Sequence, residues 1–159
     1  MLLPLLGPLL VVASAAAAIA DAERAFAARC AAVGIRQSFL EFFADDGISF
    51  APDAGNAIQR LVAQVAPTKP RAILQWGPEQ TEAQGDLGWS TGPTIFGDPT
   101  GKRPDRYGYY FSIWRRQRDG TWKVELDLGT DTTSQRVAIP GAAQSRDLQP
   151  TREPTVPGN

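Results

Sequence analysis

Hydrophobic residues recur at helical spacing in the first half of the chain. Residues 21–33 are predicted to form a helix capped by Asp21, because apolar side chains return at i, i+4 and i+7 (Phe26, Cys30 and Val33). Gly34 ends or kinks that helix, and the spacing then continues through Ile35, Phe39 and Phe42. The run Asp45-Asp46-Gly47 is typical of a turn.

A short strand and a further helix are predicted after this turn. Ile48, Ser49 and Phe50 alternate between apolar and polar, as a strand does, and the alternation stops at Pro52. Asn56 is a suitable N-cap for the helix, whose apolar stripe ends before Pro67 (Ile58, Leu61, Val62 and Val65).

The second half of the chain changes to period two, which predicts strands over residues 72–76, 80–84, 87–91, 107–117 and 121–128. Pro93 indicates a sheet edge or a bulge near Gly92. Asp119-Gly120 joins the last two strands as a hairpin. Helices followed by a run of antiparallel strands indicate an α+β fold with the helices on one face of the sheet.

Two terminal segments differ from this folded unit. Residues 1–20 contain no charged side chain and end in small residues, which is typical of a signal peptide cut before Asp21. A membrane anchor is the alternative, since the run is just long enough to span a bilayer. Residues 131–159 are rich in Pro, Thr, Gln and Ser and lack aromatic residues, so we expect them to be disordered. The expected product is one domain over residues 21–130, periplasmic or secreted, with no stable membrane anchor after cleavage.

The composition excludes several kinds of chemistry. The 159 residues include no histidine and one cysteine, Cys30, so Ser-His-Asp and Cys-His catalytic arrangements and an internal disulfide are excluded. The same composition gives no support for a metal site, and no cofactor is expected. A formal net charge of −1 gives no electrostatic reason to expect a nucleic acid partner. Cys30, on an apolar helical stripe, is expected to be a small buried side chain.

Three stretches carry a family resemblance: FLEFFADDGISF (39–50), GDLGWSTG (85–92) and YFSIWRRQRDGTWKVELDLG (110–129). With the predicted order of elements, the chain resembles the nuclear transport factor 2-like superfamily, and within it the SnoaL-like and ketosteroid isomerase-like domains. The resemblance implies a curved, cone-like antiparallel sheet packed on N-terminal helices, with a pocket, and members often dimerise. It implies no single activity, because some members are isomerases, cyclases or dehydratases and others only bind or assemble.

Two registers of the predicted hairpin place its carboxylates differently. With a two-residue turn at Asp119-Gly120, the apolar side chains of both strands share one face, and Glu125 and Asp127 lie on the other. With a three-residue turn, the partner faces swap. The first register separates apolar from polar residues more cleanly, so both carboxylates are interpreted as surface charges. A β-bulge within residues 121–128 would instead turn Asp127 into the cone and raise its pKa.

The first functional hypothesis is an exported domain whose apolar cone binds a small apolar molecule. The residues expected to line that cone are Trp76, Trp89, Tyr109, Phe111, Ile113, Leu126 and Asp127. Filling of the core is the alternative role for the tryptophans.

Two further hypotheses stay open, and no residue pattern decides whether the chain is an enzyme. One is an isomerase, cyclase or dehydratase of the SnoaL-like kind, in which a carboxylate acts with a tyrosine (Asp45, Asp46 or Asp127 with Tyr109 or Tyr110). The other is an assembly module that forms a homodimer through the outer sheet face, with Trp114 as an exposed anchor.

Overall fold

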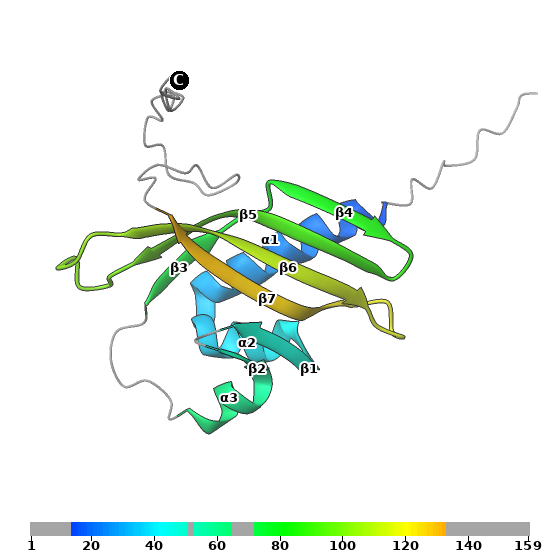
Figure 1. Ribbon diagram of the computed structural model, residues 1–159, viewed down its shortest axis with the longest axis horizontal. Helices are drawn as coiled ribbons and strands as arrows, with labels where there is room; N and C mark the ends of the chain where they lie inside the picture. Colours follow the sequence, from blue (N-terminus) through cyan, green and yellow to red (C-terminus); the bar gives the residue numbers. More distant parts are fainter. Residues whose placement is uncertain (1–13, 51–52, 65–71, 133–159) are drawn as a thin grey trace, which may run out of the picture.

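Helices lie against one face of a curved sheet in the computed structural model, which describes residues 14–50, 53–64 and 72–132 (Figure 1). The helices are α1 (Ala15–Val33), α2 (Ile35–Phe42) and α3 (Ala57–Ala63). The strands are β1 (Phe43–Phe50), β2 (Ala54–Asn56), β3 (Ile73–Trp76), β4 (Gln80–Gln84), β5 (Leu87–Gly97), β6 (Arg106–Arg116) and β7 (Trp122–Thr132). The α+β class and the helix-on-sheet arrangement expected from the sequence are confirmed.

The strand order is β2-β1-β7-β6-β5-β3, with β4 also paired to β5. β1 runs parallel to β7, whereas the other pairs are antiparallel. The expected curved antiparallel sheet therefore includes one parallel pair, which makes the sheet mixed. The long strands β5, β6 and β7 form its centre, with α1 crossing them on one side (Figure 1).

β5 continues through Pro93, which the sequence associated with an edge or a bulge. β4 pairs with β5 from Leu87 to Thr91, and β3 pairs with it from Thr94 to Gly97. Gly92 and Pro93 fall between these two partners, so the missing N–H of the proline leaves no ladder bond unmade on that side. Pro93 is thus paired with Tyr109 of β6 on one side of the strand and has no strand partner on the other.

α1 begins earlier than predicted. Its N-cap is Ser14, whose hydroxyl accepts a hydrogen bond from the Ala17 N–H at 3.1 Å, and not Asp21. Ile19 is fully buried in the core. Residues 15–20, assigned to the signal peptide by sequence, are therefore part of the helix. None of the helices in the described ranges combines the length and apolar character that a membrane span requires.

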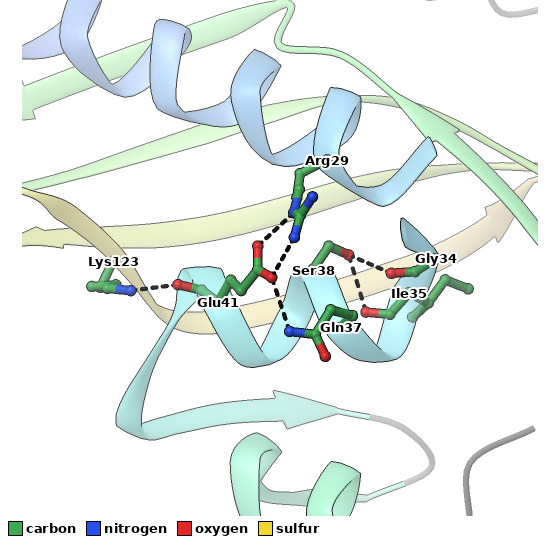
Figure 2. A network of polar contacts seen from close by, with 7 residues as sticks. All are labelled: Arg29, Gly34, Ile35, Gln37, Ser38, Glu41 and Lys123. Atoms are coloured by element: carbon green, nitrogen blue, oxygen red, sulfur yellow. Dashed lines mark hydrogen bonds and ion pairs between the residues drawn. The ribbon is translucent and has the colours of Figure 1, made fainter. Parts of the chain in front are cut away.

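Gly34 separates α1 from α2, as predicted, with a φ of 89° that favours glycine. An ion pair connects the two helices (Figure 2). Arg29 donates from Nε and Nη2 to the two carboxylate oxygens of Glu41, at 2.6 and 2.8 Å, and this lowers the Glu41 pKa to about 2. Lys123 of β7 donates to the Glu41 carbonyl oxygen, so the end of α2 is also attached to the sheet.

The core is built around Phe26 of α1. The centroid of its ring lies 4.8–4.9 Å from the ring centroids of Phe42, Phe39 and Trp76. Cys30 is buried in the same cluster, as expected, and burial raises its pKa. A buried thiol with a raised pKa is a poor nucleophile, so Cys30 serves as a small apolar side chain.

Two local predictions meet different outcomes around β1 and α3. The run Asp45-Asp46-Gly47 is not a turn, because β1 continues through it with a register irregularity against β7. Asn56 does cap α3, accepting from the Gln59 N–H at 2.7 Å. The rest of the predicted α3 stripe (Val65), like Pro67 and the tail after residue 132, lies outside the described residues.

Candidate functional site

A bulge in the β6–β7 hairpin decides which way its carboxylates point. Near the turn, Trp114 pairs with Val124, but the next residue along β6, Ile113, pairs with Leu126. Glu125 is the extra residue, and beyond it Ser112 pairs with Asp127. Both registers considered from the sequence are therefore present, one on each side of the bulge.

The bulge places Asp127 on the helix-facing side of the sheet, so its interpretation as a surface charge is wrong. Directly paired residues share a face, and Asp127 shares one with Ser112 and, on β5, with Ser90. Ser90 contacts Glu23 of α1, which identifies this face as the one under the helix. Glu125 is held in an ion pair with the exposed Arg115.

Polar side chains form a line across four strands on this face, which we call the polar row. It consists of Ser90 (β5), Ser112 (β6), Asp127 (β7) and Ser49 (β1), paired in that order. On one side of the row lies Trp114. On the other lies Tyr110, whose directly paired neighbours are both glycines, Gly92 and Gly129. A polar line between two aromatic side chains is therefore built into the middle of the sheet.

Glu23 of α1 lies over the β5 end of the polar row and is fully buried. The indole N–H of Trp76 donates a hydrogen bond to Glu23 Oε1 at 2.6 Å. The indole N–H of Trp114 donates to Glu23 Oε2 at 2.9 Å, and the Ser90 hydroxyl donates to the same oxygen. Burial is the main cause that raises the Glu23 pKa to about 7, against the lowering effect of these three donors. With both oxygens engaged, Glu23 anchors α1 to β3, β5 and β6.

The sequence contained a signal for this anchor that was missed. Ile19, Glu23, Phe26 and Cys30 follow one another at spacings of four, three and four residues, so Glu23 lies on the apolar stripe of α1. A carboxylate on such a stripe is buried with the stripe, and it needs hydrogen-bond donors from the opposing surface.

Asp127 marks the other end of the polar row. Ser112 Oγ donates to its Oδ1 at 2.7 Å, which lowers its pKa, but burial has the larger effect and raises the pKa to about 6. The residue keeps some exposed surface. In the part of the chain that the structure describes, no cationic side chain contacts this carboxylate.

Tyr110 carries the one buried polar side-chain atom that lacks a partner in the described ranges. The residue is 6% exposed, and its hydroxyl oxygen makes no hydrogen bond there. Burial raises the Tyr110 pKa, and the nearby charges of Glu23 and Asp127 raise it further. Ser90 lies close enough to lower this pKa but not in hydrogen-bonding geometry. An unpaired buried hydroxyl costs free energy, so it needs an explanation.

The two glycines beside Tyr110 differ in the space around them. A Cβ atom on Gly92 would clash with the Gly77 carbonyl oxygen, whereas one on Gly129 would have a single neighbour, the Tyr109 carbonyl oxygen at 3.9 Å. Gly129 is also exposed. The site is therefore closed on the β5 side of Tyr110 and open on the β7 side, next to Asp127.

Most of the residues predicted to line the pocket lie on the opposite face. Trp76 and Asp127 are on the helix-facing side. The other five share the outer face: Trp89, Tyr109, Phe111, Ile113 and Leu126. There the rings of Trp89 and Phe111 stack with centroids 5.8 Å apart, and Tyr109 is 40% exposed. The assignment of these five residues to the pocket is wrong. The outer face is itself apolar, so apolar character did not distinguish it from the helix-facing side.

The remaining candidates from the sequence separate in the same way. Asp45 and Asp46 are exposed in β1. Trp114 is fully buried and cannot be an exposed dimer anchor. Of the proposed acid and tyrosine combinations, Asp127 and Tyr110 share the helix-facing side of neighbouring strands, and the Asp127 charge raises the Tyr110 pKa. No cluster of three or more metal-ligating side chains occurs within the described residues.

Comparisons with known proteins identify the fold. No protein-family model matches the chain, and none of the curated proteins does. Among solved structures, a ketosteroid isomerase-like protein from Erwinia carotovora atroseptica is 11% identical with a TM-score of 0.55, covering 74% of this chain and 96% of its own. The S. rosetta CaMKII hub is 15% identical with a TM-score of 0.55, covering 77% and 100%. A conserved protein from Planctomyces limnophilus is 18% identical with a TM-score of 0.54, covering 73% and 96%.

The chain has the nuclear transport factor 2-like fold. This confirms the fold that the sequence resemblance implied, and at these identities the likeness extends to the fold alone.

Proposed function

We propose that this domain binds a small, mostly apolar molecule at the open end of the polar row, with one polar group held by Asp127 and Tyr110. The observation that carries the proposal is the buried, unpartnered Tyr110 hydroxyl beside a desolvated carboxyl group. Ligand sites commonly combine apolar walls with a few convergent polar groups. A ligand that hydrogen-bonds to Tyr110 would offset the cost of leaving its hydroxyl unpaired.

The surroundings suit such a ligand. Tyr110 belongs to the same buried cluster as Phe43, Trp76 and Val124, which supply apolar surface. The open space at Gly129 gives access from the β7 side. Glu23 is not available to a ligand, because both of its oxygens already accept hydrogen bonds. Asp127 and Tyr110 are therefore the groups left to recognise a polar atom.

The test is a comparison of captured molecules. Purified wild-type protein is incubated with an extract of the source cells, and retained small molecules are identified by mass spectrometry. We expect molecules that the wild type retains and that Tyr110→Phe and Gly129→Leu do not. Tyr109→Phe, one residue away on the outer face, is the matched control and should retain them. Identical profiles for all four proteins would contradict the proposal.

A second candidate is proton-transfer catalysis of the isomerase, cyclase or dehydratase kind. The observation that favours it is the Asp127 pKa of about 6, since a general base works best with a pKa near the operating pH. Tyr110 would donate a hydrogen bond to a developing oxyanion. Turnover separates the two functions, because a binding domain leaves its ligand unchanged, whereas an enzyme converts it and should lose that turnover in Asp127→Asn.

Self-association through the outer sheet face is a separate proposal, and it would use other residues than Trp114. Several large apolar side chains are exposed (Ile48, Phe50, Leu87 and Tyr109), and contiguous exposed apolar surface marks interaction sites. Sedimentation velocity should show a homodimer for the wild type and a monomer for Leu87→Lys. A wild-type monomer at high protein concentration would contradict it.

Export to the periplasm or medium stays a prediction. Cleavage before Asp21 would remove Ile19, a fully buried core residue. We therefore expect any cut to fall upstream of Ile19, where mass spectrometry of the mature N-terminus would locate it.

A further inference from the structure

We infer that the ligand of the polar row carries a cationic amine, held as an ammonium group between the Asp127 carboxylate and the Tyr110 hydroxyl oxygen. This inference rests on the proposed function and names the chemical class of its ligand. It is carried by the charge and hydrogen-bonding capacity of the site.

The interior under α1 contains acids without a cation. Glu23 is fully buried there and Asp127 is partly buried, and the groups that donate to them are neutral: two indoles and two serine hydroxyls. Buried carboxylates are ordinarily paired with a cation or a metal ion. A bound ammonium group would supply the missing positive charge, whereas an anionic ligand would add to the repulsion.

The hydrogen-bonding capacity points the same way. An ionised carboxylate only accepts hydrogen bonds, and a tyrosine hydroxyl oxygen also accepts them. An ammonium group offers three donors and no acceptor, so one group can satisfy Asp127 and Tyr110 at once. A ligand carbonyl could accept a hydrogen bond from Tyr110. It could accept a second one from Asp127 only if that carboxyl group were protonated.

Asp127 has room for the ammonium group on the β7 side. Ser112 occupies its Oδ1, the position opposite Tyr110 is Gly129, and a side chain there would meet almost nothing. On β1, the residue that faces Asp127 is the uncharged Ser49. The other charges that act on the site are Glu23 and Arg24 of α1, and Arg24 is exposed and paired with Asp21 at 2.9 Å.

The pH dependence of binding distinguishes an ammonium ligand from a neutral acceptor. The Asp127 pKa of about 6 means that the carboxylate form dominates above that pH. An ammonium ligand should then bind about tenfold more tightly at pH 7.5 than at pH 5, because only about a tenth of Asp127 is ionised at pH 5. A carbonyl ligand should show the opposite trend.

The experiment titrates the full chain with benzylamine and with acetophenone at pH 5 and pH 7.5. The readout is the amide resonance of Gly129 and the indole resonance of Trp114 in two-dimensional NMR spectra. We expect benzylammonium to bind, to bind more tightly at pH 7.5, and to lose binding in Asp127→Asn but not in Glu125→Gln. The wild-type pH dependence stands on its own if Asp127→Asn does not fold.

Two other outcomes would contradict the inference, and they differ in what they show about the binding site. Acetophenone binding that weakens as the pH rises, with no benzylammonium binding, would overturn the ammonium assignment while supporting the binding site. Binding of neither probe at Gly129 would overturn the ammonium assignment, and the extract experiment would then decide on the site separately.

Discussion

Asp127 and Glu125 are two carboxylates two positions apart on one strand, and the structure gives them different environments. Glu125 is the bulged residue and pairs with the exposed Arg115. Asp127 faces the helices, where loss of hydration raises its pKa to about 6. An exposed ion pair contributes little to stability, whereas a buried carboxyl without a cation is costly. Such costly groups are concentrated at functional sites.

Ser112 sets how far the Asp127 pKa rises. Its hydroxyl donates to Asp127 Oδ1 at 2.7 Å and stabilises the ionised form. Ser112→Ala removes that donor, so we expect the Asp127 pKa to move above about 6. Carboxyl carbon shifts followed by NMR across pH 3–9 measure the midpoint. Ser49→Ala, the control on the other side of Asp127, should leave the midpoint nearly unchanged, and an equal shift in both variants would contradict the role of Ser112.

At the scale of elements, the sequence predicted the bounds of the strands better than the face of the sheet on which each side chain lies. β4 was predicted at its observed bounds, because Gly85-Asp86 marks its end and alternation marks its length. The position of Asp127 could not be derived in the same way. Val124, Leu126 and Leu128 alternate regularly, which favours an unbroken strand with all three on the helix side.

The alternation was misleading because both faces of this sheet are apolar. Leu126 and Leu128 pair with Ile113 and Phe111 on the outer face, whereas Val124 packs under the helices. Register is strongly specified only where one face alone is apolar. The bulge at Glu125 moves the residues after it to the opposite face of the sheet, but the hydrophobic pattern is the same with or without a bulge. The sequence therefore allowed the bulge as an alternative but could not favour it.

The two glycines flanking Tyr110 provide a matched test of how β5 and β7 enclose the site. Gly92→Ala should cost roughly 3 kcal/mol of unfolding free energy, because its Cβ would clash with the backbone carbonyl oxygen of Gly77, between β3 and β4. Gly129→Ala meets open space and should change stability by within about half a kcal/mol. Urea denaturation measures both. Equal costs would show that Tyr110 is enclosed on both sides.

At the scale of the whole molecule, Glu23 connects the N-terminal helix to three strands through neutral donors. Trp76, Ser90 and Trp114 come from β3, β5 and β6, so one carboxylate joins three strands of the seven-stranded sheet to α1. Its location in the core, close to Phe26 and Ile19, makes its ionisation part of the folding equilibrium.

The last prediction is that this protein becomes less stable as the pH rises from 5 to 8. The Glu23 pKa rises from its ordinary 4.5 to about 7 on folding, and the Asp127 pKa from 3.8 to about 6. Between these values the folded chain holds protons that the unfolded chain has released, so the free energy of unfolding falls with increasing pH. Glu23 alone should account for a decrease on the order of 3 kcal/mol, which levels off above about pH 7.

Urea denaturation at intervals between pH 5 and pH 8 measures this decrease. The range stays above the region in which Glu41, whose pKa Arg29 lowers to about 2, would lose its stabilising charge as the pH falls. Glu23→Gln should flatten the profile, because an amide cannot ionise, and the residual slope would belong to Asp127. Glu82→Gln changes an exposed carboxylate on β4 and should keep the wild-type slope. If the Glu23→Gln profile ran parallel to the wild type, the proton held by the folded chain would have to lie elsewhere, and Glu23 would be ionised within its ring of donors.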